Sequence, residues 1–178
     1  MFVKVNYFEF FQIPVSFFLD LSLLKEKYFQ NSRNFHPDYH ATADEETKQN
    51  MLEQSTLNNE AFKTLNDEHL RVRYILGLYN LNSDGEKQNL PSDFLMEMME
   101  LNEAIAETDG DEESLEEISS RLSGLEVELN SQLNSAMKKF DEAPNDAGKK
   151  ELLIEVQQAY LKFKYLLRIR ESLNKFAD

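Results

Sequence analysis

The residues whose types and order best suit recognition chemistry form the tripeptide His36-Pro37-Asp38. Proline removes a backbone donor and pushes the preceding residue out of the helical region, so a helix before it should end near Phe35. His36 and Asp38 are therefore expected at the start of a loop, where proteins place many recognition groups. On its own such a tripeptide is usually only a helix stop, so the elements around it must decide its role.

Metal binding is one alternative for this loop, because His36, Asp38 and His40 alternate along it. A structural zinc site requires four ligands, and the sequence has no cysteine to supply one. The absence of cysteine also excludes disulfides and a cysteine nucleophile. We recognise no nucleophile–base pair, phosphate-binding loop or metal ligand set. The sequence therefore predicts a protein that is not an enzyme and that needs no cofactor.

The elements that position the tripeptide are expected to be helices, because Gly and Pro number only five and four and period-two alternation is rare. Asp20 is a candidate cap for a helix that reaches about Phe35, with Leu24 and Tyr28 on one side. Further helices of the N-terminal half are expected over residues 7–11, 45–65 and 67–79.

A polar, glycine-containing break at 81–89 is the best candidate for a domain boundary. Pro91 suits the first turn of a new helix that runs to about Glu107. Two longer helices are expected over 114–140 and 149–176. Three helices joined by short turns pack most simply as an antiparallel bundle. The predicted fold class is all-α, with two domains and a linker at 1–80, 90–178 and 81–89.

The net charge of −14 argues against nucleic acid as the main partner, because phosphate binding requires a basic surface. Most of the imbalance lies in residues 93–128, which contain 13 acidic residues and one basic residue, Arg121. The simplest interpretation of such a run is a solvated face. The sequence contains no run of about 18 apolar residues, so no membrane-spanning helix is predicted. The N-terminus lacks the basic, apolar and small-residue segments that follow one another in a signal peptide. We therefore expect a cytoplasmic protein that does not bind a membrane.

The helices around the tripeptide resemble the J-domain of Hsp70 co-chaperones over about residues 5–80. The matching features are Tyr7-Phe8, His36-Pro37-Asp38 and a later run that begins Asn59-Glu60-Ala61-Phe62 and ends Leu65-Asn66-Asp67. Residues 94–101, Phe-Leu-Met-Glu-Met-Met-Glu-Leu, with the acidic region and helical C-terminus after them, resemble HscB, called Jac1 in mitochondria. HscB is the J-protein dedicated to iron–sulfur cluster transfer. The resemblance implies a four-helix J-domain with an antiparallel hairpin core and a C-terminal three-helix bundle.

The same resemblance implies that the tripeptide loop docks on an Hsp70 of the HscA type and stimulates ATP hydrolysis there. Asp38 would offer a carboxylate to an Hsp70 arginine, since charge-assisted pairs are strong and directional. Pro37 would fix the loop, and His36 would orient it. The implied Hsp70-binding residues are His36, Pro37, Asp38, Lys25, Lys27 and Arg33. An ordinary solvated face is the alternative for the three basic residues.

Two departures from the J-domain pattern bear on this docking. J-domains usually follow the tripeptide with Lys or Arg, whereas Tyr39 stands here. The helix before the tripeptide is usually rich in basic residues, but Phe29, Gln30 and Asn34 occupy positions close to the motif. The electrostatic part of docking is therefore expected to be weak, or matched to one specialised Hsp70.

The helix that contains Phe94 is predicted to have two apolar sides. Phe94, Met98, Leu101 and Ile105 form a stripe suited to a bundle core. The far side carries a second set of apolar residues that continues into carboxylates, namely Leu95, Met96, Met99, Glu100, Glu103 and Glu107. Exposed apolar groups next to one another usually mark a partner site. The alternative is that the bundle buries this side as well.

The HscB resemblance favours a partner site, because in that family this helix binds the iron–sulfur scaffold, IscU. It implies that these six residues bind the scaffold and that Phe163 of the last helix adds an aromatic contact. A core position is the alternative for Phe163. The predicted function is a co-chaperone that links the scaffold to an Hsp70 and assists cluster transfer and protein maturation. The alternative function is a helical adaptor that recruits a different client through its acidic bundle.

Overall fold

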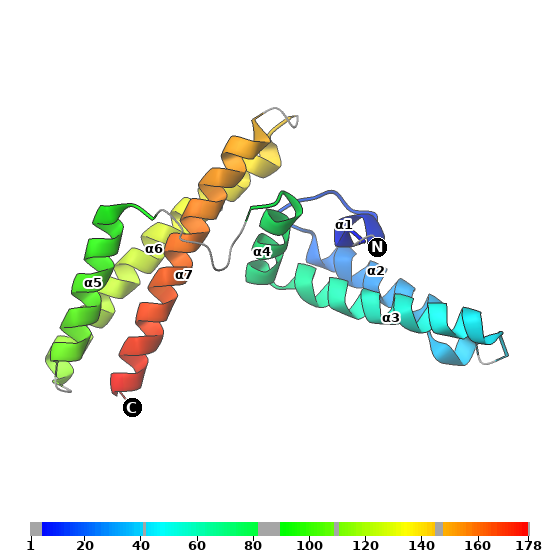
Figure 1. Cartoon of the computed structure of the whole chain (residues 1–178), viewed down its shortest axis with the longest axis horizontal. Helices are drawn as coiled ribbons and strands as arrows, with labels where there is room; N and C mark the ends of the chain where they lie inside the picture. Colours follow the sequence, from blue (N-terminus) through cyan, green and yellow to red (C-terminus); the bar gives the residue numbers. More distant parts are fainter. Residues whose placement is uncertain (1–4, 41, 82–89, 109–110, 145–147, 178) are drawn as a thin grey trace. The chain divides into compact units, whose positions relative to one another are not determined.

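The structure, a computed structural model, describes the chain except for residues 1–4, 41, 82–89, 109–110, 145–147 and 178. Every regular element in the described part is helical, which confirms the predicted all-α fold class. The chain divides into two compact units, Met1–Tyr79 and Asn80–Asp178 (Figure 1). The predicted linker at 81–89 lies almost entirely outside the described residues, as do parts of the short turns expected between the helices of the C-terminal half.

The first unit contains α1 (Tyr7–Phe10), α2 (Leu21–Asn34), the 3-10 turn η1 (Pro37–His40), α3 (Glu45–Asn66) and α4 (Glu68–Leu78). Helices α2 and α3 run antiparallel, and η1 lies in the connection between them (Figure 1). Each helix ends at or next to the residue predicted from the sequence. The loop expected after His36 is not irregular throughout, because the proline begins a short turn of 3-10 helix.

Side-chain caps explain why the helices begin where they do. Asp20, the predicted cap of α2, accepts hydrogen bonds from the N–H groups of Ser22 and Leu23 at 2.9 and 3.1 Å. Asp44, Asp67 and Asp111 cap the N-termini of α3, α4 and the later helix α6 in the same manner. Hydrogen bonds from the hydroxyl and the N–H of Ser114 hold the pKa of the Asp111 carboxyl below its usual range.

Two polar anchors that the sequence does not predict hold the first unit together. Arg71 is buried, and its Nε donates to the carbonyl of Phe17 at 2.8 Å while Nη1 donates to the carbonyl of Leu65. The Leu65 carbonyl lies in the last turn of α3 and has no partner within the helix. Tyr7 stacks on Tyr74 with ring centroids 4.5 Å apart, and the Tyr74 hydroxyl accepts from the Tyr7 N–H at 2.9 Å. Arg71 thus fixes the segment before α2, and the tyrosine pair fixes α1 to α4.

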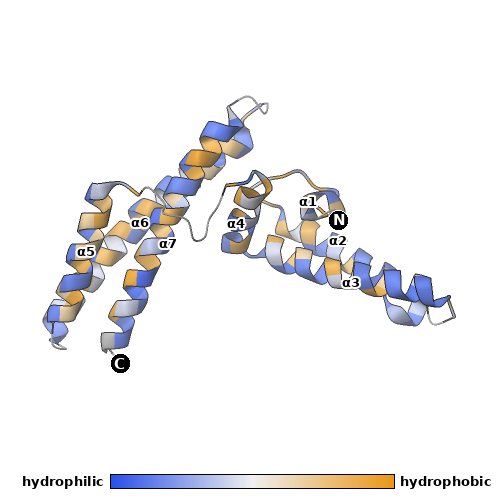
Figure 2. Cartoon of the chain, viewed as in Figure 1, coloured by the Kyte–Doolittle hydropathy of each residue, from blue (hydrophilic) through white to orange (hydrophobic). Residues whose placement is uncertain are grey.

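The second unit contains α5 (Ser92–Glu107), α6 (Glu112–Glu142) and α7 (Lys149–Ala177). Helices α6 and α7 form a long antiparallel hairpin, and the shorter α5 packs along part of it (Figure 1). Apolar and hydrophilic residues alternate along these helices, as the orange and blue bands in Figure 2 show. The predicted C-terminal helical bundle is therefore confirmed, but only one stretch of it is three helices thick because α5 is about half as long as its neighbours.

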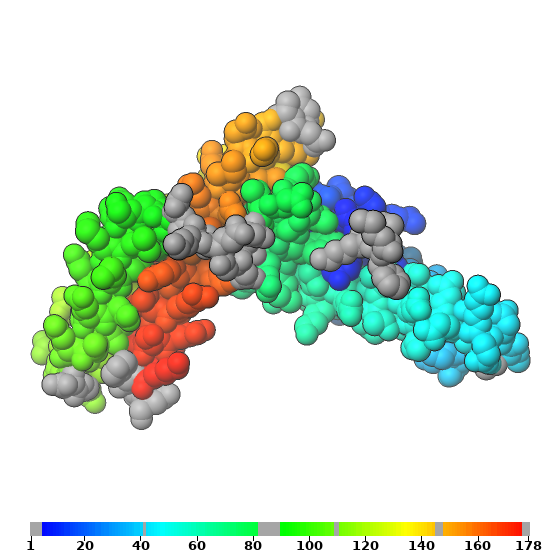
Figure 3. All heavy atoms as spheres, viewed as in Figure 1, coloured from blue at the N-terminus to red at the C-terminus, as the bar shows by residue number. Residues whose placement is uncertain are grey.

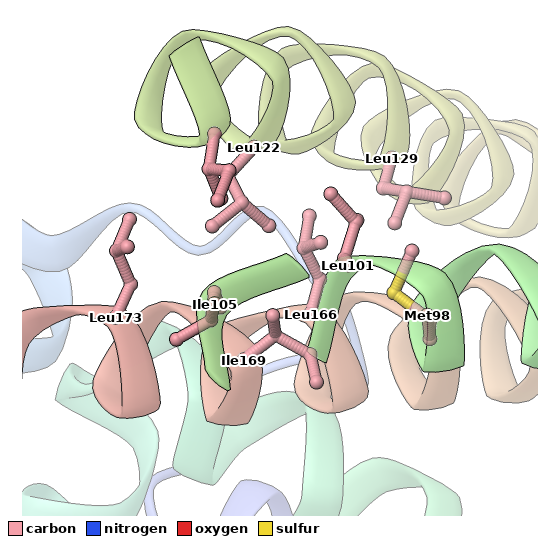
Figure 4. Close-up of a cluster of buried hydrophobic side chains, with 9 residues drawn as sticks. Met98, Leu101, Ile105, Leu122, Leu129, Leu166, Ile169 and Leu173 are labelled. Atoms are coloured by element: carbon pink, nitrogen blue, oxygen red, sulfur yellow. The ribbon is translucent and has the colours of Figure 1, made fainter. Parts of the chain in front are cut away.

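A cluster of buried apolar side chains holds the three helices of the bundle together. Figure 4 draws its nine buried members and labels eight of them, Met98, Leu101, Ile105, Leu122, Leu129, Leu166, Ile169 and Leu173. Met98, Leu101 and Ile105 of α5 are at most 1% exposed, which confirms the predicted core stripe of this helix. Phe94, the first member of that stripe, is only partly buried and packs at the edge of the cluster.

A second interaction between α6 and α7 is polar. The Arg170 guanidinium makes two parallel hydrogen bonds of 2.9 Å to the carboxylate of Glu126. It also donates to the hydroxyls of Ser119 and Ser123 at 3.1 and 2.9 Å. A bidentate pair of this kind fixes geometry more strongly than a single surface ion pair. Arg170 therefore sets the register between the two long helices at the stretch of the bundle that α5 covers.

Candidate functional site

The predicted Hsp70-binding loop begins where α2 ends. The N–H groups of Phe35 and His36 bond to the carbonyls of Asn31 and Arg33 at 2.9 and 3.4 Å, which tightens and closes the helix. The Tyr39 N–H then bonds to the His36 carbonyl at 3.1 Å and shapes the turn after Pro37. These short-range bonds hold the tripeptide in one conformation at the C-terminus of α2.

Within the tripeptide, the imidazole of His36 organises the residue that follows the proline. Its Nδ1 accepts the backbone N–H of Asp38 at 3.2 Å, so in the neutral ring the proton lies on Nε2. The same Nδ1 lies 3.7 Å from Oδ2 of Asp38. The Asp38 side chain is 89% exposed, so its carboxylate is accessible to a partner rather than used in the fold. An exposed carboxylate on a restrained turn is suited to pairing with a cation.

The three basic residues predicted for this surface do not all lie close to the tripeptide. Arg33 is exposed and shares a hollow with His36 and Asp38. Lys25 is also exposed, and Lys27 is half-buried, but both lie toward the other end of α2. Eight residues of helix separate Lys25 from Arg33, a distance of about 12 Å along the axis. Of the three, Arg33 is the one that lines the same hollow as Asp38, and an interface that covers this hollow can also reach along α2 to the two lysines.

The structure does not favour the metal alternative for this loop. The Nε2 of His40 lies 2.7 Å from the Asn34 carbonyl, and because a carbonyl only accepts, the imidazole must donate there. The Nε2 nitrogen therefore carries a proton and is not a metal ligand, which leaves Nδ1 as the ring nitrogen of His40 that could bind a metal ion. Among the described residues, no group of three or more His, Asp or Glu side chains is arranged to hold a metal ion.

The surface around the tripeptide also includes two aromatic residues, which the sequence analysis identified only as departures from the J-domain pattern. Phe29 and Tyr39 line the same hollow of about 440 Å³ as Ser32, Arg33, His36 and Asp38. Phe29 is 51% exposed and Tyr39 is 74% exposed. The Tyr39 ring meets the His36 ring edge-on, with centroids 6.0 Å apart. The signal for these residues was present in the sequence, because each stands where a basic residue was expected.

The second candidate surface is the side of α5 that faces away from the buried cluster. Met96 and Met99 are 61% and 58% exposed, whereas Met98 between them is fully buried. Glu100, Glu103 and Glu107 are exposed on the same helix. Leu95 is half-buried, so it lies at the border between this surface and the bundle. We call Leu95, Met96, Met99, Glu100, Glu103 and Glu107 together the α5 patch.

Contacts with both neighbouring helices keep α5 in place. The Phe94 ring lies edge-on to Tyr165 of α7 at 6.2 Å, and the Lys162 ammonium lies 5.6 Å from the Phe94 ring centroid. Arg121 of α6 pairs with Glu97 at 3.3 Å. Figure 3 shows the side chains of α5 and α7 adjoining one another on one face of the unit. The α5 patch is therefore carried by a helix that is anchored on its other side.

Phe163, the aromatic residue predicted to contact the scaffold, lies on α7. It is partly buried and packs against the buried cluster of the bundle. Part of the Phe163 ring therefore belongs to the core of the bundle, which was the alternative to a scaffold contact. The remaining surface is accessible, and α7 is one of the two helices against which α5 packs.

Comparisons with known proteins agree on one family. A family model described as the HSCB C-terminal oligomerisation domain matches residues 90–174. A co-chaperone protein HscB homolog of Psychromonas ingrahamii is 32% identical over 137 residues, which cover 74% of this chain and 81% of that protein. A homolog with the same description from Vibrio cholerae is 40% identical over 102 residues. This second match spans 57% of the chain and 60% of the relative, so it covers less than two thirds of that protein's length.

Solved structures extend the similarity to both units. The crystal structure of human co-chaperone protein HscB matches with a TM-score of 0.71 and 26% identity, over 98% of this chain and 83% of the human one. Chaperone HscB from Vibrio cholerae matches with the same TM-score, 28% identity and 96% coverage of both chains. Together with the His36-Pro37-Asp38 turn and the helical bundle, these matches show that the chain belongs to the HscB family of co-chaperones. In the described part of the chain, no helix is long and apolar enough to cross a membrane.

Proposed function

We propose that this protein binds an iron–sulfur cluster scaffold of the IscU type, delivers it to a dedicated Hsp70 of the HscA type and stimulates the ATPase of that Hsp70. The observation that carries the proposal is the exposed His36-Pro37-Asp38 turn in a chain of the HscB family. In this proposal the ATP chemistry takes place in the partner, and the chain contributes binding surfaces only.

The Hsp70 contact is proposed at the C-terminal end of α2. Asp38 presents its carboxylate to an arginine of the Hsp70, and Arg33 beside it donates hydrogen bonds to an acidic group of the partner. Pro37 limits the backbone of the turn, and the bond from the Asp38 N–H to His36 restrains it further. A surface that is ordered before binding loses less conformational entropy when the partner docks. Lys25 and Lys27 add attraction at longer range, which salt should weaken.

The scaffold contact is proposed at the α5 patch. Two exposed methionine side chains give this surface apolar area that can adapt to an irregular partner. The carboxylates of Glu100, Glu103 and Glu107 follow them along the helix and favour a partner that carries basic groups beside an apolar site. Phe163 can extend the apolar part from α7. Together these features fit a protein partner better than a small molecule.

Separating the two units should separate the two activities. Residues 88–178, expressed alone, are expected to fold and to bind the scaffold with the affinity of the whole chain, but not to stimulate the Hsp70. The physical reason is that the α5 patch and the His36 turn belong to different compact units. Circular dichroism checks the fold, and isothermal titration with the scaffold checks the binding.

The N-terminal fragment of the chain is the matched control. Residues 1–80 contain the turn but no part of the α5 patch, and they are expected to show the reverse pattern of weak Hsp70 stimulation without scaffold binding. An unfolded 88–178 fragment would show that the second unit depends on the first. A folded fragment that does not bind the scaffold would remove the proposed role of the α5 patch.

A further inference from the structure

We propose that the hollow beside the His36-Pro37-Asp38 turn receives an apolar side chain of the Hsp70, and that Phe29 and Tyr39 make the main contacts with it. This inference rests on the proposed function, because it concerns the same docking surface. It assigns most of the docking free energy to aromatic contact rather than to the basic side chains of α2.

The geometry of the hollow supports this assignment. Phe29 comes from α2, one turn before Arg33, and Tyr39 comes from η1. The hollow thus spans the end of the helix and the turn, and it includes both charged groups that the turn presents. A volume of about 440 Å³ is comparable with small ligand pockets in proteins, and it is sufficient for a large side chain. A partner side chain that enters the hollow beside Asp38 lies next to these two rings.

Local charge argues against a contact driven mainly by electrostatic attraction. The hollow has one cation, Arg33, and one anion, Asp38, so these two formal charges cancel. The next cations along the helix, Lys25 and Lys27, are separated from Arg33 by about two turns. Aromatic residues are enriched in the centres of protein interfaces, whereas exposed ion pairs contribute little. The two rings are therefore the strongest available source of binding energy.

The Phe29 ring is available to a partner because Phe29 is about half exposed. Its neighbour Tyr28 stacks on Phe62 of α3, with centroids 4.3 Å apart, and makes the contact between the two helices. Phe29 lies 5.3 Å from the Tyr28 ring and is tilted by 57°, so it rests against this pair from the outside. Truncation of Phe29 should leave the stack of Tyr28 and Phe62 intact. The expected occupant is an aliphatic or aromatic Hsp70 side chain flanked by one basic and one acidic group.

The test compares single substitutions in the full chain by their effect on ATP hydrolysis by the Hsp70 of the same organism. Phe29→Ala and Tyr39→Ala are each expected to raise the concentration for half-maximal stimulation about tenfold, which corresponds to about 1.4 kcal/mol of binding free energy. The maximal rate should stay unchanged because the His36 turn is intact. Tyr39→Phe retains the ring and should behave like the unaltered protein.

Phe18→Ala is the matched control. Phe18 is also 51% exposed and lies in the same unit, but it does not line the hollow. Its truncation should change the half-maximal concentration by less than about twofold, well below the tenfold step that 1.4 kcal/mol represents. A rise in salt from about 0.05 to 0.5 M should also have less effect than either alanine substitution, since screening acts on charges and not on apolar contact.

The outcomes distinguish the inference from the proposed function. If Phe29→Ala and Tyr39→Ala match Phe18→Ala while His36→Gln still abolishes stimulation, the aromatic inference is overturned and the proposed function stands. A strong salt dependence with no effect of the alanines would assign docking to the basic residues instead. If the unaltered protein stimulates no Hsp70 of its organism, both the proposed function and the inference fail.

Discussion

His36→Gln is expected to abolish stimulation of the Hsp70 while the melting temperature of the protein stays nearly unchanged. His36 is exposed and contributes nothing to the buried core of the first unit. Its Nδ1 accepts the Asp38 N–H, so its loss releases the residue whose carboxylate is proposed to bind the Hsp70. A glutamine side chain has one more rotatable bond than histidine, and its amide does not hold an acceptor at the position of Nδ1. Circular dichroism melting and steady-state ATP hydrolysis are the two measurements.

His40→Gln is the matched control for this substitution. His40 lies in the same turn, but its ring bonds to the Asn34 carbonyl and does not line the hollow. A glutamine can donate a similar bond, so stimulation should be retained. If folded His36→Gln protein stimulates the Hsp70 as well as the unaltered protein, then the turn is only a helix stop and the Hsp70 role is wrong.

Replacement of Leu95, Met96 and Met99 together by alanine should weaken scaffold binding by more than tenfold, which is more than about 1.4 kcal/mol. Burial of one large apolar side chain contributes about 1.5–3 kcal/mol, so the loss of three such contacts easily reaches this value. Stability should fall only modestly, because Met96 and Met99 are more than half exposed and alanine favours the helix. The half-buried Leu95 accounts for the loss of stability that is expected. Hsp70 stimulation without scaffold should be unaffected.

Met98→Ala on the same helix is the control with the opposite pattern. Met98 is fully buried in the bundle, so its truncation should cost about 2–5 kcal/mol of unfolding free energy. At a temperature where the variant remains folded, scaffold affinity should be retained. Should the triple variant melt as Met98→Ala does, the α5 patch is buried in solution, and the role proposed for Glu100, Glu103 and Glu107 loses its physical basis.

The helices could be predicted from the sequence because their boundaries depend on neighbours in the chain. Asp20 caps α2 through residues two and three positions later, and Pro37 ends it through its own ring. The core stripe of α5 follows from the helical period alone, and Met98, Leu101 and Ile105 are buried as that period requires. The position of the His36-Pro37-Asp38 turn directly after α2 was predictable for the same reason, because the bonds that shape this turn are local.

Contacts between distant residues were not predictable in this way. Arg71 bonds to a carbonyl 54 residues earlier, and Arg170 pairs with a carboxylate 44 residues earlier. Neither pair leaves a periodic pattern in the sequence. The hollow beside the turn was also not predictable, because its lining combines one side of α2 with the side chain of Tyr39. The sequence showed that Phe29 and Tyr39 depart from the family pattern, but only the structure shows that they lie together.

The central claim is that one chain binds both the scaffold and the Hsp70, and ATP hydrolysis tests it most directly. The Hsp70 of the same organism is titrated with the unaltered full chain, first alone and then with the iron–sulfur scaffold at a fixed concentration. We predict a saturable rise in the hydrolysis rate with the chain alone and a larger rise when the scaffold is also present. A chain that binds the scaffold but leaves the rate unchanged at every concentration would contradict the account and indicate an adaptor for a different client.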